Sequence, residues 1–291
     1  MSQSFPRTDL AWETHELWRR GEKRSVPGLI VRTETAEGFE KQVLEISSEE
    51  ASKELCKPQG RYVTFSLGSL LRREADAFDR GCAALAGELR RQLALKGGES
   101  VLAVCLGNPD VTPDAVGPLA ADSILATRHL KEAMPGDFGD FRSVTVLRTG
   151  VLGTTGLESA ALAAAAVRAV GADRVVAVDA LAACGTERLC RSVQISDAGI
   201  VPGSGVGNSR SALNAETLGV PVVAVGVPTV VDAATLCADL AGAPAPGGQE
   251  LFVTPRDIDA RVREIARLVG CAVDLALHDG LTMEDLRLLL P

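Results

Sequence analysis

Two aspartates stand at positions where a carboxylate could do chemistry. Asp114 lies in the segment GNPDVTPDAVGP at 107–118, and Asp179 directly follows the apolar run RVVAV. A carboxylate beside a buried apolar strand is costly unless it is paired or functional. Two carboxylates that face one cleft titrate as a coupled pair, so one can hold a proton while the other activates a water molecule. The pair therefore predicts peptide hydrolysis without a nucleophilic side chain, with Asp114 and Asp179 as the catalytic residues.

Each of these aspartates also has a purely structural explanation. Asp114 precedes a predicted helix, where a carboxylate can cap the helix start and interact favourably with its dipole. Asp179 could instead organise the loop that follows its strand. On position alone, the structural and the catalytic explanations both stay open.

Four further polar residues are candidates for the same cleft: Asn108, Asp197, Ser204 and Asp232. Ser204 lies in PGSGVGN at 202–208, which matches neither a P-loop nor a GxSxG nucleophile motif. A tight glycine loop that shapes the cleft explains this segment more simply. Solvated or capping roles explain Asp197 and Asp232 better than a place in the cleft does.

The sequence carries no recognisable metal or cofactor motif. The three histidines His15, His129 and His278 are far apart, and no HExxH spacing occurs. The seven cysteines form no CxxC pair, and several lie in apolar runs such as VLAVCLGN. This pattern favours buried free thiols in a reducing cytosol. We therefore expect no metal and no cofactor.

Charge and hydropathy argue against two classes of partner. The net charge of −8 weighs against direct binding to nucleic acid, which needs a basic surface to replace counterions. The first residues lack a basic stretch followed by an apolar core, and no apolar run approaches the length of a membrane span. We therefore expect a cytoplasmic protein without a membrane partner.

Apolar strands alternate with helical patterns from residue 101 onward. The predicted strands cover 101–106, 143–147, 174–181 and 220–227, and the predicted helices cover 114–133, 157–170, 229–241, 255–277 and 283–290. Such alternation is typical of a parallel sheet covered on both faces. The predicted fold class is α/β, a three-layer α/β/α arrangement with a mostly parallel, phosphorylase/hydrolase-like sheet. Because these sheets bind ligands outside the carboxyl ends of their strands, Asp114 and Asp179 should meet at one edge.

Residues 1–100 follow a different pattern. A short helix is expected around 10–20, and the alternation around Glu37-Gly38 in 28–46 predicts a hairpin. A helix at 47–57 and a strand at 61–67 complete a small β-rich annex at 28–67. Apolar residues at helical spacing predict a long helix over 71–96.

Eight ordered motifs carry a resemblance to a known family. They are RTDLAWE (7–13), LGNPDVTPDAVGP (106–118), TRHL (127–130), GVLGTTGLE (150–158), AVDALAA (177–183), QISDAGIVPGSGVGN (194–208), GVPTVVDA (226–233) and LFVTPRDID (251–259). With them the chain resembles the germination protease of spore-forming bacteria, an atypical aspartic endopeptidase. The two essential aspartates of that family fall on Asp114 and Asp179. The resemblance also implies small acid-soluble spore proteins as substrates, the cytoplasm of the developing spore as the location, and a homotetramer.

The resemblance further implies a zymogen that removes its own first residues. Substrates of the family are cut after an acidic residue in a Thr-Glu-apolar-Ala-x-Glu context, and Thr8 to Glu13 has the same form. We therefore expect a propeptide at 1–9, cleavage between Asp9 and Leu10, and a single protease domain at 10–291. The alternative is an arm with only structural value.

Two other functions stay open. The sheet and its aspartates are also similar to hydrogenase-maturation endopeptidases, which makes metal-assisted hydrolysis the alternative mechanism, although no third ligand is obvious. A non-catalytic binding protein for the same small partners is the second alternative. The chain departs from longer family members at 234–250, where about twenty residues (including AGAPAPGGQE, read as a flexible linker) replace a longer insertion. This departure puts in doubt any oligomer contact that the insertion supplies.

Overall fold

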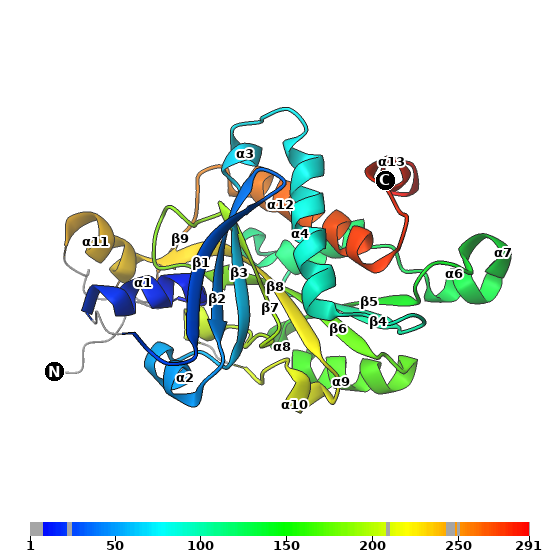
Figure 1. Ribbon diagram of the computed structural model, residues 1–291, viewed down its shortest axis with the longest axis horizontal. Helices are drawn as coiled ribbons and strands as arrows, with labels where there is room; N and C mark the ends of the chain where they lie inside the picture. Colours follow the sequence, from blue (N-terminus) through cyan, green and yellow to red (C-terminus); the bar gives the residue numbers. More distant parts are fainter. Residues whose placement is uncertain (1–7, 22–24, 208–209, 243–247, 249–250, 291) are drawn as a thin grey trace.

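The computed structural model describes residues 8–21, 25–207, 210–242, 248 and 251–290. These residues build one nine-stranded sheet with the order β1-β2-β3-β7-β8-β6-β4-β5, and β9 pairs with β8 outside this path (Figure 1). The strands are β1 Leu29–Ala36, β2 Phe39–Ile46, β3 Gly60–Ser66, β4 Val101–Leu106, β5 Val144–Gly150, β6 Arg174–Ala182, β7 Ser192–Ser196, β8 Val222–Asp232 and β9 Phe252–Val253. Most of the predicted propeptide, and most of the predicted linker at 241–249, lie outside the described residues.

The sheet confirms the predicted α/β class and contains the predicted parallel strands. The four strands β8, β6, β4 and β5 run parallel to one another, and all other strand pairs are antiparallel. The β-rich region expected at 28–67 contains the predicted hairpin, β1 and β2, followed by β3. It continues the central sheet, because β3 pairs with β7 and β7 pairs with β8. Sequence analysis missed β7, whose five residues SVQIS are all buried although three of them are polar.

The helices lie on both faces of this sheet. They are α1 Ala11–Gly21, α2 Glu49–Leu55, α3 Gly68–Leu71, α4 Ala77–Leu93, α5 Val116–Ala120, α6 Arg128–Ala133, α7 Pro135–Phe138, α8 Leu152–Thr155, α9 Ser159–Val170, α10 Ala215–Leu218, α11 Ala233–Ala241, α12 Ile258–Leu277 and α13 Met283–Leu289. The helices expected near 10–20, 157–170, 255–277 and 283–290 are confirmed. The helix expected at 229–241 begins later, because β8 continues to Asp232.

The continuous helix predicted over 114–133 is wrong. The segment forms α5 and α6, with short 3-10 turns at 112–114 and 121–123 and an extended residue at Ile124. Tertiary hydrogen bonds replace helical ones at this break. Leu125 N donates to the Asp274 carboxylate at 3.0 Å, and Thr127 N donates to the Val144 carbonyl at 3.1 Å.

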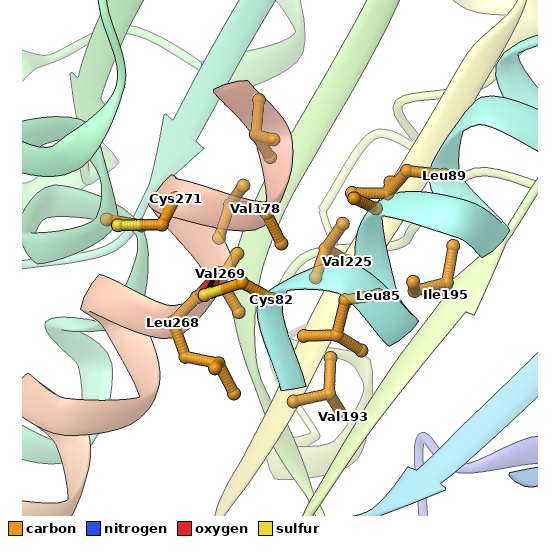
Figure 2. Packing of buried hydrophobic residues seen from close by; sticks show 14 of the residues in the cluster. Cys82, Leu85, Leu89, Val178, Val193, Ile195, Val225, Leu268, Val269 and Cys271 are labelled. Atoms are coloured by element: carbon orange, nitrogen blue, oxygen red, sulfur yellow. Dashed lines mark hydrogen bonds between the residues drawn. The ribbon is translucent and has the colours of Figure 1, made fainter. Parts of the chain in front are cut away.

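Alternate side chains of the central strands pack into two separate hydrophobic cores, one on each face of the sheet. In β6, Val176 and Val178 face the core under α4 and α12, whereas Val175 and Ala177 face the core under α9. Figure 2 shows the first of these cores, where Val178 and other strand residues meet Leu85, Leu89, Leu268 and Val269 of the two helices. Cys82 and Cys271 are buried there as free thiols, as the sequence predicts. No helix within the described ranges is long and apolar enough to cross a membrane.

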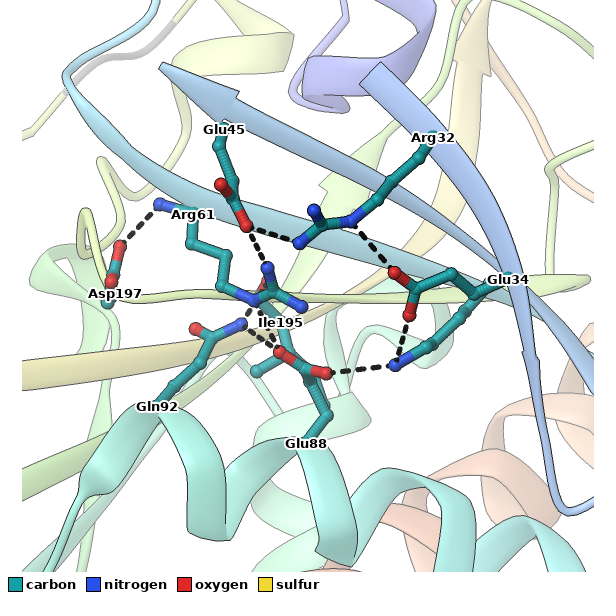
Figure 3. A network of polar contacts seen from close by, with 9 residues as sticks. Arg32, Glu34, Glu45, Arg61, Glu88, Gln92, Ile195 and Asp197 are labelled. Carbon is teal, nitrogen blue, oxygen red and sulfur yellow. Dashed lines mark hydrogen bonds and ion pairs between the residues drawn. The ribbon is translucent and has the colours of Figure 1, made fainter. Parts of the chain in front are cut away.

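An ion-pair network joins α4 to the antiparallel strands (Figure 3). Glu88 of α4, whose side chain is 2% exposed, accepts from Arg61 Nε at 2.8 Å and lies 3.4 Å from Lys41 Nζ. Burial raises the pKa of Glu88, but its contacts with Arg61, Gln92 and Lys41 outweigh burial and leave this pKa below its usual value. The network holds α4 against β1, β2 and β3. It therefore stabilises the antiparallel half of the sheet.

Candidate active site

A cavity of about 600 Å³ opens at the carboxyl ends of the parallel strands. The ends of β4, β5 and β6, the loop residues Pro202 and Gly203, and Phe252 of β9 contribute to its lining. Four acidic residues from distant parts of the sequence line this cavity: Asp9, Asp114, Glu158 and Asp179. Glu158 is paired with Arg210, which also lines the cavity. The predicted meeting of Asp114 and Asp179 at one edge of the sheet therefore takes place.

Asp179 occupies a buried position inside β6. It is paired in register with Gly226 of β8 and is 5% exposed. Its Oδ1 accepts a hydrogen bond from Ala180 N at 2.9 Å. Burial raises the pKa of Asp179 well above its usual range, and the negative charges of Asp114 and Asp9 raise this pKa further. The Ala180 contact opposes the shift only in part, so Asp179 retains a proton more readily than an ordinary aspartate does.

Asp114 is held by the tight turn that follows β4. Its Oδ2 accepts a hydrogen bond from Asn108 N at 2.8 Å, which closes the turn. Gly107 has φ +113°, and a Cβ at this position would lie 2.0 Å from the Asp114 carbonyl oxygen, so only glycine fits. Thr229 of β8 donates to the Pro113 carbonyl at 2.7 Å and anchors the same turn. Burial raises the pKa of Asp114, and the Asn108 contact partly opposes that effect.

The two aspartates therefore differ in a way that suits acid–base chemistry. Both have a raised pKa, but the shift of Asp179 is the larger and has the charge of Asp114 among its causes. Like charges that share one cavity disfavour the doubly ionised state. A pair with a single proton contains an acid and a base at once, which is what activation of water next to a carbonyl group requires.

Asp9 is seated against the carboxyl end of β6. The ladder between β4 and β6 ends at Val178, whereas β6 continues beside β8 to Ala182. The freed main chain of Ala182 accepts a hydrogen bond from Asp9 N at 2.9 Å and donates one to Asp9 Oδ2 at 2.8 Å. Ser204 Oγ donates to Asp9 Oδ1. The residue before the predicted cleavage position is thus part of the site.

The residues after Asp9 are also fixed. Leu10 is completely buried against Leu181 and Ala183. Ala11 N donates to Gln194 Oε1 at 2.8 Å. The Glu13 carboxylate accepts from Cys184 N at 2.8 Å and from Gly185 N at 3.2 Å, and burial raises its pKa. The segment 8–13 therefore lies along residues 181–185, immediately beside the cavity.

The other candidates from the sequence have different places. Ser204 joins the site through Asp9, whereas the side chain of Asn108 accepts from Asp110 N and only its main chain touches Asp114. Asp197 accepts from Arg61 N at 2.7 Å, at the start of β3. Asp232 caps α11 through Thr235 N at 2.8 Å. None of the four residues Asn108, Asp197, Ser204 and Asp232 lines the cavity itself.

Sequence reasoning missed the residues that hold the segment 8–13. Lys57 Nζ donates to the carbonyl oxygens of Thr8 and Asp9 at 3.1 and 3.0 Å. Lys57 lies just after α2 and Gln194 lies in β7, and neither position carries a recognisable motif. Only the substrate-like form of residues 8–13 signalled that something must bind them. Across the described ranges, no group of three or more His, Cys, Asp and Glu side chains is placed to hold a metal ion.

Comparison with protein families gives a match over most of the chain. A family model described as germination protease, a peptidase family, matches residues 7–243. This range includes Asp9, Asp114, Asp179 and Ser204.

Comparison with curated proteins and solved structures gives further likenesses. A germination protease of Caldanaerobacter subterraneus subsp. tengcongensis is 40% identical, over 98% of this chain and 98% of that protein. A germination protease of Clostridium perfringens is 35% identical, over 96% of this chain and 97% of that protein. One from Priestia megaterium is 40% identical, over 82% of this chain and 67% of that protein. The crystal structure of a NiFe hydrogenase maturation protease from Thermococcus kodakarensis matches 64% of this chain and 98% of that chain, with 21% identity and a TM-score of 0.37.

Proposed function

This chain belongs to the germination protease family, and on that premise we propose that it is an endopeptidase of the aspartic type whose catalytic residues are Asp114 and Asp179. One observation carries the proposal. Both carboxylates and Asp9, the residue before the expected cleavage position, line a single cavity at the carboxyl ends of the parallel strands.

The proposed reaction uses the two carboxylates as a base and an acid. Ionised Asp114 takes a proton from a water molecule, whose oxygen bonds to the carbonyl carbon, while Asp179 gives its proton to the carbonyl oxygen. Asp114 then passes its proton to the peptide nitrogen as the carbon–nitrogen bond breaks, and the second hydroxyl proton returns to Asp179 as the new carboxyl group forms. The roles are assigned in this order because Asp179 is the more deeply buried and has the larger rise in pKa.

The first bond cut is, in this proposal, the protein's own. Cleavage between Asp9 and Leu10 would release residues 1–9 as a propeptide. The support is the placement of Asp9 at the cavity, with its carbonyl oxygen bound by Lys57 Nζ at 3.0 Å. If residues 1–9 had only a structural role, the Asp9 carbonyl group would not need to be bound beside the cavity.

The proposed external substrates are small acid-soluble spore proteins, which a homotetramer cuts during germination. The proposed location is the cytoplasm, where the protein is made in the developing spore. The likeness to germination proteases over nearly the full chain supports this substrate class. Incubation with purified spore proteins tests the substrates, and light scattering of the purified chain tests the assembly.

The decisive experiment replaces each aspartate by its amide. Asp114→Asn and Asp179→Asn should each slow the loss of residues 1–9 by about 10⁴-fold, the scale seen when a catalytic group is removed. Asp110→Asn, an exposed aspartate in the same loop, should process itself at the normal rate. Mass spectrometry of the intact chain at mildly acidic pH follows the reaction, and the new chain should begin at Leu10.

Each outcome separates the alternatives. If both amide variants still process themselves, the aspartate mechanism is wrong. If a strong chelator stops the wild-type reaction, metal-assisted hydrolysis replaces the proposed mechanism. If the wild-type chain cuts neither itself nor spore proteins but still binds them, the protein is a binding protein.

A further inference from the structure

We propose that the groups holding residues 8–13 are the substrate subsites of this enzyme, and that Ser204 together with the Ala182 N–H selects an acidic side chain before the scissile bond. This inference rests on the proposed endopeptidase function. It names the residues that bind each position of the substrate, taken from the residues that bind each position of the chain's own segment 8–13. The segment thus occupies its own site in the manner of a bound substrate.

The acid subsite is built for a carboxylate. Both oxygens of Asp9 are acceptors, one for Ala182 N at 2.8 Å and the other for Ser204 Oγ. An amide in the same place would carry no charge, so the Ala182 N–H would meet a neutral oxygen, and the Ser204 hydroxyl would have to turn and accept from the NH₂ group. Hydrogen bonds to a charged acceptor are about twice as strong as those to a neutral one. Gly205 forms the wall of the subsite, since a Cβ there would lie 2.2 Å from Asp9 Oδ2. The subsite therefore distinguishes a carboxylate from an amide of equal size.

Contacts with the main chain of residues 8 and 9 hold the segment next to the scissile bond, and they do not depend on the side chains of the substrate. Asp9 N donates to the Ala182 carbonyl oxygen at 2.9 Å, so the segment continues the hydrogen bonding of β6 where β4 has ended. Lys57 Nζ donates to the Thr8 and Asp9 carbonyl oxygens. The Asp9 oxygen is the one that Asp179 protonates in the proposed reaction, and the half-buried ammonium group of Lys57 beside it polarises the carbonyl group for attack by water. Lys57 therefore acts on any substrate, whatever its side chains.

The residues after the scissile bond meet a second set of groups. Leu10 fills an apolar site next to Leu181, and Gln194 Oε1 binds the main chain of Ala11. Two further main-chain donors, Cys184 N and Gly185 N, receive the Glu13 carboxylate. The subsites for positions 9 to 13 therefore favour, in this order, an acidic, an apolar, a small, any, and an acidic residue.

The test in solution compares two peptides with the sequence of residues 5–16, one natural and one with Asn in place of Asp9. The enzyme is the processed chain, residues 10–291, that remains after self-cleavage. Wild-type protein should cut the natural peptide at least about tenfold faster in kcat/KM than the Asn peptide. Ser204→Ala should lower kcat/KM for the natural peptide by about 10- to 100-fold, the range for a hydrogen bond to a charged group, and should lower it less for the Asn peptide, which loses only a neutral hydrogen bond.

Two controls accompany this comparison. Ser211→Ala, an exposed serine near the same loop, should leave both peptides unaffected. Lys57→Met should slow both peptides by the same factor, mainly in kcat, whereas Lys53→Met, an exposed lysine of α2, should slow neither. Equal losses on both peptides in Ser204→Ala, or no preference for the natural peptide in wild type, would overturn the acid subsite.

A second measurement does not depend on cleavage. In the full-length Asp114→Asn chain, hydrogen exchange at the amides of Asp9 and Ala11 reports whether the segment is bound. Adding Ser204→Ala or Asp9→Asn should speed this exchange by at least about tenfold, and adding Ser211→Ala should not. Unchanged exchange would overturn the subsite proposal. Faster exchange together with a wild-type chain that cuts nothing would instead overturn the endopeptidase function and leave a binding site.

Discussion

The unequal surroundings of Asp114 and Asp179 decide how a proton divides between them. Asp179 is nearly inaccessible, and three effects raise its pKa: burial, the charge of Asp114 and the charge of Asp9. Asp114 is more accessible, and the Asn108 N–H stabilises its ionised form. The proton is therefore retained on the more buried member, which leaves Asp114 as the ionised base of the proposed reaction.

The pH dependence of self-processing follows from this division. Once the pH rises through the raised pKa of Asp179, the acid is lost, and the rate should fall by about tenfold per pH unit. We expect the fastest loss of residues 1–9 at mildly acidic pH, measured by intact mass between about pH 4 and about pH 9. A rate that increases steadily with pH over this range would contradict the assignment of Asp179 as the acid.

The same raised pKa makes Asp179 a cost to stability. Between the usual pKa of an aspartate and the raised value, the folded state binds more protons than the unfolded state, so stability falls as the pH rises through this window. Asp179→Asn removes the ionisable group. At neutral pH it should raise Tm by at least about 2 °C, the shift for about 1 kcal/mol in a large domain, while it abolishes cleavage. Asp110→Asn should leave Tm unchanged in the same calorimetric scan.

At the scale of elements, α5 fixes the turn that carries Asp114. Gly117 of α5 sits directly on the sheet, where a Cβ would lie 2.2 Å from the Leu106 carbonyl oxygen of β4 and 2.7 Å from the Val178 carbonyl oxygen of β6. Both of these atoms belong to the main chain and cannot turn away. The short helix, the end of β4 and Asp114 are therefore held as one unit.

We expect Gly117→Ala to lower the free energy of unfolding by about 1–3 kcal/mol or more, because the added methyl overpacks the contact. It should also slow self-processing, because α5 must move and Asp114 moves with it. Gly87→Ala is the matched control. Gly87 lies exposed in α4 with no neighbour near its Cβ position. Alanine there should raise the free energy of unfolding by about 0.5–1 kcal/mol. Denaturant unfolding measures both, and equal stabilities for the two variants would refute the close approach.

At the scale of the whole molecule, a chain binds its own residues 8–13. The segment ends in the first turn of α1, contacts Lys57 after α2, and reaches the parallel half of the sheet at β6. These parts are brought together because β3, β7 and β8 join the antiparallel and parallel strands into one sheet. Asp9 is therefore held beside the cavity of its own chain.

Self-processing should accordingly be a first-order reaction within one chain. Its rate constant should stay the same over about a hundredfold range of protein concentration, because the effective concentration of the segment is set by the fold. Wild-type protein mixed with intact Asp114→Asn chains should leave those chains uncut while it processes itself. A rate that rises in proportion to concentration, or rapid cutting of the variant chains, would show processing between molecules.

The sequence by itself determined the parallel strands, most of the helices, the two aspartates and the motifs of the family. These features depend on local patterns: an apolar run forms a buried strand, and a polar residue after it lies at the strand's end. For this reason the edge shared by Asp114 and Asp179 was predictable before any coordinates.

Only the tertiary structure decided which other groups reach the site. β7 escaped prediction because its polar residues are buried between two neighbouring strands, a property of pairing and not of the segment itself. Lys57 and Gln194 reach residues 8–13 for the same reason, since long-range pairing sets their places. Asp197 and Asp232 were candidate cleft residues. A long-range hydrogen bond places Asp197 at the start of β3, whereas a local bond to Thr235 N makes Asp232 the cap of α11, a role that the sequence also indicated.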